Sequence, residues 1–184
     1  KVASHAHGAE GVAAAARAGV ASIEHGTYVD EGGIRAMKAN GTFLVPTLSP
    51  TIAYRENLPK GLYTAVVAAK IKVRLEATGK NIAAARAAGL PIAYGTDSGV
   101  SEHGRNAEEM PLMVRYGGMS AQEVVVSATR TAAELLGLEN EIGRLAPGFA
   151  ADIIGVRGNP IDDLGALQRD RIEYVVAAGR VVKD

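Results

Sequence analysis

Three histidines and one aspartate follow short apolar segments, at points where strands are expected to end. His5 and His7 close the first segment, His25 ends the second, and Asp97 follows a segment at residues 91–96. Imidazole nitrogens and carboxylate oxygens are good ligands for divalent cations such as Zn²⁺. A bound cation lowers the pKa of its water toward about 7, and a neighbouring carboxylate can then accept and deliver a proton. If these side chains converge, they could perform metal-assisted hydrolysis.

Each of these residues also has an ordinary structural explanation. A single loop histidine is usually a solvated or hydrogen-bonded side chain. Asp97 follows Gly95 and Thr96, where an aspartate often caps a helix or stabilises a turn. The shared position at strand ends is what favours a metal site, because the C-terminal ends of the strands in a parallel β/α barrel face one mouth.

The elements that must position these residues alternate between strand and helix patterns. Continuous apolar strands alternating with helices indicate a parallel sheet that is covered by helices, and right-handed crossovers place those helices on one side of a curved sheet. Strands are predicted at residues 1–5, 20–23, 42–45 and 91–96. Helices are predicted at residues 9–18, 31–40, 62–88 with a break near Gly79, 107–117 and 120–136.

The pattern changes after about Gly143. A turn leads into an apolar strand at 153–156, and two further strands at 174–177 and 180–182 flank Ala178-Gly179 as in a tight hairpin. These strands predict a small β unit beside the parallel sheet.

Composition excludes several other classes of function. The 184 residues are 47% hydrophobic and 22% charged, with 20 Lys plus Arg against 20 Asp plus Glu. This balance gives no electrostatic reason to expect nucleic acid or a membrane as partner. No apolar stretch approaches the length of about 20 residues that spans a bilayer. The absence of cysteine excludes disulfides and thiolate metal sites, and we expect a cytoplasmic protein.

Several phrases, in their order along the chain, resemble the amidohydrolase superfamily. The similarity is greatest to the branch related to imidazolonepropionase, which includes Xaa-Pro dipeptidases. The phrases are His5-Ala6-His7-Gly8, Ser22-Ile23-Glu24-His25-Gly26, Val45-Pro46-Thr47, Gly95-Thr96-Asp97-Ser98-Gly99 and His103-Gly104-Arg105-Asn106. The tail at 143–148 and 151–153 is similar to the family's return to a small β-sandwich. One phrase alone is weak, whereas the ordered set is specific and covers nearly the whole chain.

The resemblance implies an α/β fold, the second half of a TIM (β/α)₈ barrel followed by part of a small β-sandwich domain. It assigns the four predicted strands to strands five to eight of the barrel. Residues 1–142 would then form the C-terminal half of the barrel, and residues 143–184 part of the sandwich.

The resemblance also implies roles for single residues. His5 and His25 match metal ligands, and Asp97 matches the residue that binds metal and shuttles the proton. His7 stands where relatives often carry tyrosine facing the substrate. His103 and Arg105 follow the eighth strand and are candidate substrate contacts, although His103 could equally be a solvated loop residue and Arg105 the start of a helix. Arg55 is a further candidate for binding a substrate carboxylate.

The implied function is metal-dependent hydrolysis of amide bonds in a small molecule or a dipeptide. One or two Zn²⁺ ions would activate a hydroxide for attack on the carbonyl carbon, with Asp97 as the proton shuttle. A dipeptide with a C-terminal proline is the leading candidate, and acylated amino acids, ureas, carbamates and cyclic amides stay open.

The family's His-x-His pair on strand one and its carboxylated lysine on strand four have no counterpart here. The chain opens with Lys1-Val2-Ala3, which is typical of the inside of a strand. We therefore expect the missing N-terminal half of the barrel, or a second copy of the chain, as partner, and we expect a homo-oligomer. With two ligands for one ion and one for the other, the chain alone should bind zinc weakly and be inactive. The alternatives are a non-catalytic half-barrel that serves association, or a module that binds a small ligand.

Overall fold

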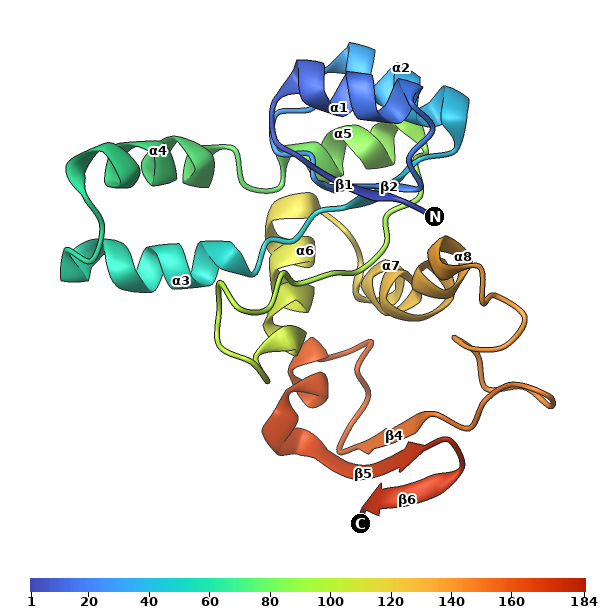
Figure 1. Ribbon diagram of the computed structural model, residues 1–184. Helices are drawn as coiled ribbons and strands as arrows, with labels where there is room; N and C mark the ends of the chain where they lie inside the picture. The colour runs from blue at the N-terminus through green and yellow to red at the C-terminus, as the bar shows by residue number, and fades with distance from the viewer.

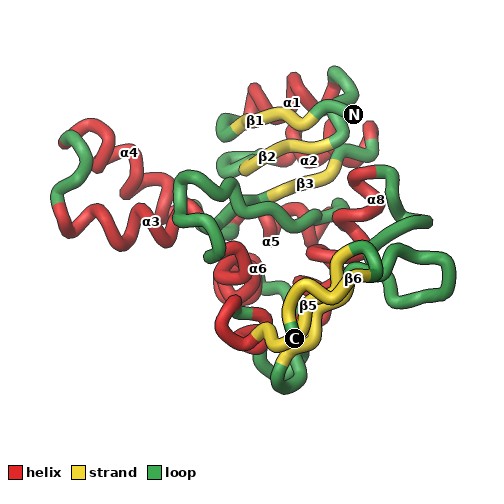
Figure 2. The backbone as a smooth tube through the Cα atoms, turned by 60° about the horizontal axis from the view of Figure 1, so that its bottom comes forward, coloured by secondary structure: helices red, strands yellow, loops and turns green.

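Residues 1–184 are all described by the computed structural model, which contains two separate sheets. The first sheet is parallel and has the order β1 (Ala3–Ala6), β2 (Ser22–His25) and β3 (Phe43–Val45). Figure 2 shows these three strands side by side, running from the N-terminal end of the molecule toward helices α3 and α4. The parallel sheet predicted from the strand and helix rhythm is confirmed.

The predicted fourth strand at residues 91–96 is reduced to one bridge. Ile92 pairs with Leu44, and the N–H of Ala93 donates to the carbonyl of Leu44 at 2.9 Å. Beyond this point the N–H of Tyr94 donates to the carbonyl of Ser127 at 3.3 Å. The segment therefore lies at the β3 edge, but it turns to a helix for its next backbone partner instead of continuing along the sheet.

Helices α1 (Ala9–Arg17), α2 (Glu31–Asn40) and α5 (Lys80–Ala88) cover one face of the parallel sheet, as Figure 1 shows. Ile23 and Leu44 point to this face and are buried against the helices, whereas Ser4, which aligns with Ile23, is partly exposed. The main core contains Val12, Ile23, Met37, Leu44, Ile82, Ile92, Met113 and Val124, among others.

The opposite face of the same sheet carries polar residues. The strand register aligns His5 with Glu24 and Glu24 with Val45, so these three side chains share that face. His5 is exposed and Glu24 is half-buried. One face of the sheet is thus a packed core. The other is only partly covered, because Val45 is buried while His5 is exposed.

Local sequence signals explain where several helices begin and end. Asp30 caps α2 by accepting a hydrogen bond from the N–H of Gly33 at 2.8 Å, and Gly41 ends it in a left-handed conformation. Ser120 and Glu123 form a capping box at the start of α7 (Ala121–Val126).

The long helix predicted at residues 62–88 is divided into two helices, and residues 50–57, where no helix was predicted, form a further one. Helix α3 (Pro50–Asn57), a 3₁₀ turn and α4 (Ala65–Glu76) form a hairpin that projects from the body of the protein in Figure 1. Gly79 separates α4 from α5 with φ of 78°, so the predicted break near this residue is confirmed.

Helix α6 (Glu109–Gly117) follows a 3₁₀ turn at Asn106–Glu108. The predicted helix at 120–136 is present as α7, a π-helical segment at Ser127–Thr131 and α8 (Ala132–Leu136). The hydroxyl of Ser127 donates to the carbonyl of Ile92 at 2.8 Å, which joins this π-helical turn to the sheet edge.

The second sheet is antiparallel, with the order β4 (Ile153–Val156), β5 (Ile172–Ala177) and β6 (Arg180–Lys183). Both residues of the predicted Ala178-Gly179 turn have positive φ, as a two-residue hairpin requires. Leu164, in the connection before β5, belongs to the same core cluster as Ile23 and Leu44 of the parallel sheet. A division into domains at residues 142 and 143 stays a prediction. No helix of the protein combines the length and hydrophobicity needed to cross a bilayer.

We expect Gly79→Ala to destabilise the fold strongly. A Cβ atom at this position would lie 2.3 Å from the carbonyl oxygen of Tyr116, and the residue would also keep a left-handed φ. Together these effects should cost on the order of 3 kcal/mol of unfolding free energy. Urea denaturation can measure this loss. Gly61→Ala is the matched control, because Gly61 has φ of 68° with nothing within 4 Å of its added Cβ. Equal losses in both variants would contradict the proposed clash.

Candidate metal centre

Three imidazoles meet where β1 and β2 end. One ring nitrogen from each of His5, His7 and His25 lies within 4.8 Å of the others, a spacing that a single cation can bridge. Nε2 of His25 is 2.9 Å from Nδ1 of His5. The ring centroids of His5 and His25 are 4.6 Å apart, as are those of His7 and His25. The donor set is therefore compatible with a divalent metal such as zinc.

The far side of the His25 ring is fixed by a threonine. The hydroxyl of Thr47 donates to the carbonyl of Pro46 at 2.8 Å, and it contacts Nδ1 of His25. Because the hydroxyl proton is used on Pro46, the Thr47 oxygen accepts the Nδ1 proton of His25. This tautomer leaves a lone pair on Nε2 of His25, the nitrogen that faces His5, and such an outer contact is what orients a metal-binding imidazole.

His7 is held in the same manner from the opposite side. Its Nδ1 lies 2.8 Å from the hydroxyl of Thr27, and its ring stacks on that of His25 at an interplanar angle of 19°. Nε2 of His7 has no protein partner. The sequence singled out His7 as a substrate contact, and the structure brings it as close to the cluster as the two expected ligands.

Burial keeps two of the imidazoles neutral. Burial, with the charges of His7, Arg74 and His5, lowers the pKa of His25 to about 3. Burial and the charges of Arg74 and His5 lower the pKa of His7 to about 4, although Asp97 opposes this shift. Neutral imidazole is the form that binds metal, so both rings are ready for a cation at neutral pH.

Asp97 lies near the histidines without joining their group. It is exposed, has φ of 51°, and its charge acts on His7 and on Glu24. The flanking hydroxyls of Thr96 and Ser98 both accept hydrogen bonds from the side-chain amide of Asn106, at 3.1 and 2.9 Å. The loop that carries Asp97 is thereby clamped to the turn before α6.

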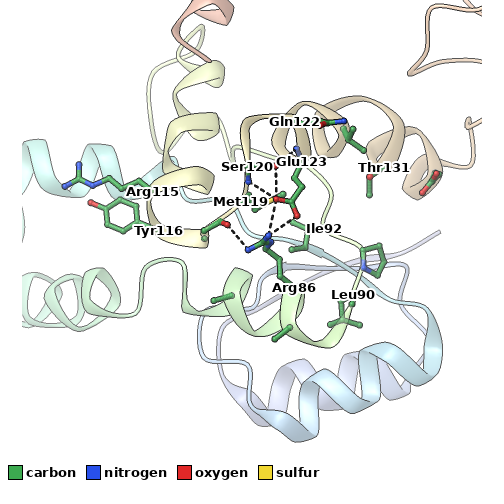
Figure 3. Close-up of a pocket in the computed structure, with 18 residues that line it drawn as sticks. Arg86, Leu90, Ile92, Arg115, Tyr116, Met119, Ser120, Gln122, Glu123 and Thr131 are labelled. Atoms are coloured by element: carbon green, nitrogen blue, oxygen red, sulfur yellow. Dashed lines mark hydrogen bonds and ion pairs between the residues drawn. The ribbon is translucent and has the colours of Figure 1, made fainter. Parts of the chain in front are cut away.

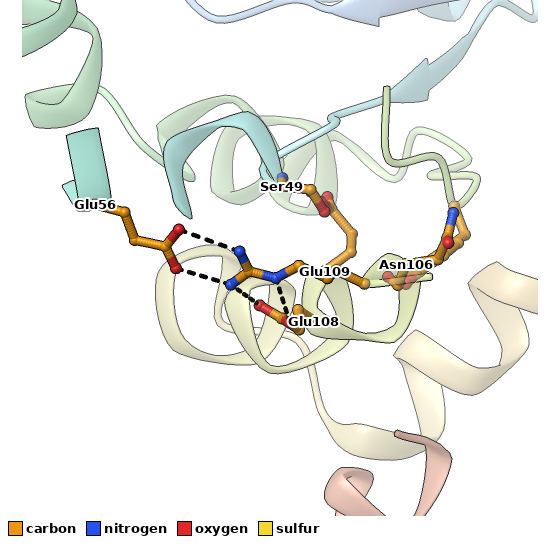
Figure 4. A network of polar contacts seen from close by, with 7 residues as sticks. Ser49, Glu56, Asn106, Glu108 and Glu109 are labelled. Carbon is orange, nitrogen blue, oxygen red and sulfur yellow. Dashed lines mark hydrogen bonds and ion pairs between the residues drawn. The ribbon is translucent and has the colours of Figure 1, made fainter. Parts of the chain in front are cut away.

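The other predicted substrate contacts are placed differently. His103 is exposed in the loop between residues 98 and 106. Arg105 is paired with Glu56 at 2.8 Å and with Glu108 at 2.7 Å, so its guanidinium already has two carboxylate partners (Figure 4). Arg55 lies over the ring of Tyr116, at 5.5 Å from the centroid. The structure brings neither His103 nor Arg55 into the histidine cluster.

Sequence reasoning missed Glu109, which is completely buried at the start of α6. Its carboxylate accepts hydrogen bonds from the N–H of Leu48 at 2.7 Å, and from the N–H and the hydroxyl of Ser49. Leu48 directly follows Thr47, so Glu109 fixes the backbone that orients His25. Figure 4 shows Glu109 beside Ser49 in this network. A glutamate in the first turn of a predicted helix carried no sequence signal for this contact.

One large hollow on the surface lies away from the histidines. It has a volume of about 1050 Å³ and lies among α5, α6 and α7, beside the ion pair of Arg86 and Glu123 (Figure 3). Arg86 also donates to the carbonyl of Gly118 at 2.7 Å, which ties the helices together. A second hollow of about 610 Å³ is lined by His7 and by residues of α3 and α4. Of the two hollows, this second one borders the histidine cluster, through the side chain of His7.

Comparison with known proteins identifies the class of this fold and site. The family model described as Amidohydrolase family matches residues 1–182, and the chain belongs to that family. A solved Xaa-Pro dipeptidase with bound methionine in its active site is 38% identical, with a TM-score of 0.92 over 100% of this chain and 45% of its own.

Two curated relatives show the same partial coverage. Ochratoxinase from Aspergillus niger is 32% identical over 99% of this chain and 38% of its own length. Imidazolonepropionase from Cereibacter sphaeroides is 34% identical over 78% of this chain and 31% of its own. The chain thus spans less than half of these relatives and matches the C-terminal portion of amidohydrolase TIM-barrel enzymes, as expected from its sequence.

We expect Glu109→Gln to destabilise the protein by about 1–3 kcal/mol, since the new amide group would face donors of hydrogen bonds. Glu108→Gln is the control, because Glu108 is partly exposed and paired only with Arg105. An exposed pair contributes at most about 1 kcal/mol. Equal unfolding free energies for the two variants would contradict the role given to Glu109.

The effect of Glu109→Gln should also depend on pH. Burial raises the pKa of Glu109 from 4.5 to about 7, against the hydrogen bonds that favour its ionised form. The folded protein therefore binds more protons than the unfolded chain between these values, and the stability due to protonated Glu109 is lost as pH rises through about 7. Urea denaturation should show a larger loss for the variant near pH 5 than near pH 8, and the reverse order would contradict this sign.

Proposed function

We propose that this chain supplies one half of the catalytic barrel of a metal-dependent hydrolase that cleaves amide bonds. The observation that carries the proposal is the convergence of His5, His7 and His25, with one nitrogen of each within 4.8 Å of the others. Membership of the Amidohydrolase family supports the reaction class. The missing half of the barrel, or a second copy of the chain, would complete the mouth.

His5 and His25 would hold the cation in this proposal. Thr47 fixes the His25 ring so that its Nε2 lone pair stays directed to the site. A divalent cation bound there would acidify a water molecule and polarise the substrate carbonyl. The pKa values of about 3 and about 4 for His25 and His7 keep these rings from competing as bases.

Asp97 would perform the proton transfer. Its carboxylate is exposed at the same edge, where it can accept a proton from the attacking water and return it to the leaving nitrogen. The clamp from Asn106 onto Thr96 and Ser98 fixes the loop on both sides of this carboxylate. Dipeptides, including those with C-terminal proline, are the substrate class that the similar Xaa-Pro dipeptidase suggests, and acylated amino acids are a second class of amide that this site could take.

We expect the chain alone to bind one Zn²⁺ ion weakly, and we expect His25→Ala to abolish that binding. Thr47→Val keeps the shape of the side chain and removes the hydroxyl that orients His25, so it should weaken binding by about 10-fold or more. Isothermal titration calorimetry with ZnCl₂ can measure both effects. His103→Ala is the matched control and should leave binding unchanged. Micromolar zinc binding that survives His25→Ala would count against the proposed centre.

Asp97→Asn should lower kcat by about 10²- to 10⁴-fold in the protein that carries a complete barrel, because the proton shuttle is lost. Hydrolysis of dipeptides with C-terminal proline and of acylated amino acids, followed by amine release, is the assay. Asp170→Asn changes an exposed aspartate outside the site and should have no effect. Unchanged kcat in the Asp97 variant would exclude this residue as the proton carrier.

A further inference from the structure

The positively charged side chain of Arg74 lies beside the histidine cluster and has no carboxylate partner. Arg74, on α4, lines the 610 Å³ hollow together with His7. Its Nη1 donates to the hydroxyl of Tyr54 at 3.3 Å, and its guanidinium carbon lies 5.4 Å from the centroid of the same ring. The tyrosine orients Arg74 but cannot neutralise it. None of the seven ion pairs in the structure includes Arg74, whereas Arg105 has two carboxylate partners.

The rest of the hollow has no negative charge. Lys70 stands one helical turn before Arg74 and also lines the hollow, so two like charges occupy one face of α4. Such a pair at i,i+4 destabilises a helix by a few tenths of a kcal/mol. No aspartate or glutamate lines the hollow. The local field therefore favours an anion, and a guanidinium suits a carboxylate because it can donate two parallel hydrogen bonds.

The remaining walls are apolar and face the same space. Tyr28 and Val67 are exposed large side chains on the hollow, and Ile71 forms its buried floor. Figure 2 shows the α3–α4 hairpin on the side toward which the parallel strands run. The hollow thus extends from the imidazole of His7 to the guanidinium of Arg74, with apolar side chains around it.

We propose that Arg74 binds the free carboxylate of the substrate, and that the hollow beside it takes the apolar side chain attached to that carboxylate. This inference rests on the proposed hydrolase function and narrows its substrates to acylated amino acids and dipeptides with an apolar C-terminal residue. Arg74 is then a specificity-determining residue.

Paired probes that differ only in charge test this inference on the 184-residue chain. N-acetyl-L-leucine carries the carboxylate, and N-acetyl-L-leucinamide replaces it with a neutral amide. We expect the chain to bind the acid at least about tenfold more tightly than the amide, as judged by NMR titration up to the solubility of each probe. Equal binding of both probes, or no binding of the acid, would overturn the inference.

Substitutions of Arg74 test whether this residue causes the preference for the acid over the amide. Arg74→Met should abolish the difference between the two probes, and Arg74→Lys should keep part of it, because lysine retains the charge without the two-pronged geometry. Arg115→Met is the matched control, since Arg115 also lies over a tyrosine ring, at 5.1 Å from the centroid of Tyr116. An acid preference that persists in Arg74→Met, with an unchanged circular dichroism spectrum, would refute the assignment.

A failure of the role proposed for Arg74 can be distinguished from a failure of the hydrolase proposal. Probe binding needs no metal, whereas zinc titration measures the histidine centre alone. Normal zinc binding with no acid preference would reject the role of Arg74 and leave the proposed function intact. An acid preference without zinc binding in the complete barrel would reject the hydrolase and, with it, the placement of this carboxylate in a substrate.

Discussion

The buried carboxylate of Glu109 joins two segments that are about 60 residues apart, and the geometry of the histidine centre depends on this contact. Its oxygens accept from the backbone at Leu48 and Ser49. The preceding residue, Thr47, is in a left-handed conformation that a β-branched side chain seldom adopts. Anchoring of the next two N–H groups stabilises this conformation and places the Thr47 hydroxyl on Nδ1 of His25.

The same short segment before α6 also controls the opposite side of the site. Asn106 binds the hydroxyls on either side of Asp97, and Arg105 joins the turn to Glu56 at the end of α3. Residues 105–109 therefore connect the Asp97 loop, the end of α3 and the segment that contains Thr47. Most of these contacts are partly exposed and individually weak. The buried one at Glu109 is costly to break, because an unsatisfied donor would remain in the core.

Local signals were sufficient to predict most elements, since each depends on residues close in sequence. Asp30, Gly41 and the Ser120–Glu123 box define helix ends through their own backbone contacts. The grouping of His5 with His25 was also predictable, because parallel strands end at one edge. The roles of Glu109, Thr47 and Arg74 were not, since each requires contacts between segments whose spacing only the folded chain fixes.

The sheet itself explains why the expected strand at residues 91–96 is so short. A strand continues only while its backbone groups find hydrogen-bond partners on the neighbouring strand. After Ala93 the backbone instead bonds to the π-helical turn at Ser127. That turn directs the chain away from β3 and toward the Asp97 loop.

Electrostatics explain how an anion bound at Arg74 would favour a metal ion at the neighbouring imidazoles. A guanidinium near neutral imidazoles disfavours a second positive charge on them, and a divalent cation would feel the same repulsion. A bound carboxylate would offset that repulsion, so metal and anionic substrate would strengthen each other's binding. The neutral imidazoles of His7 and His25 could then bind a cation, while the guanidinium of Arg74, which has no carboxylate partner, could bind an anion. Each bound ligand would reduce the repulsion that the other experiences.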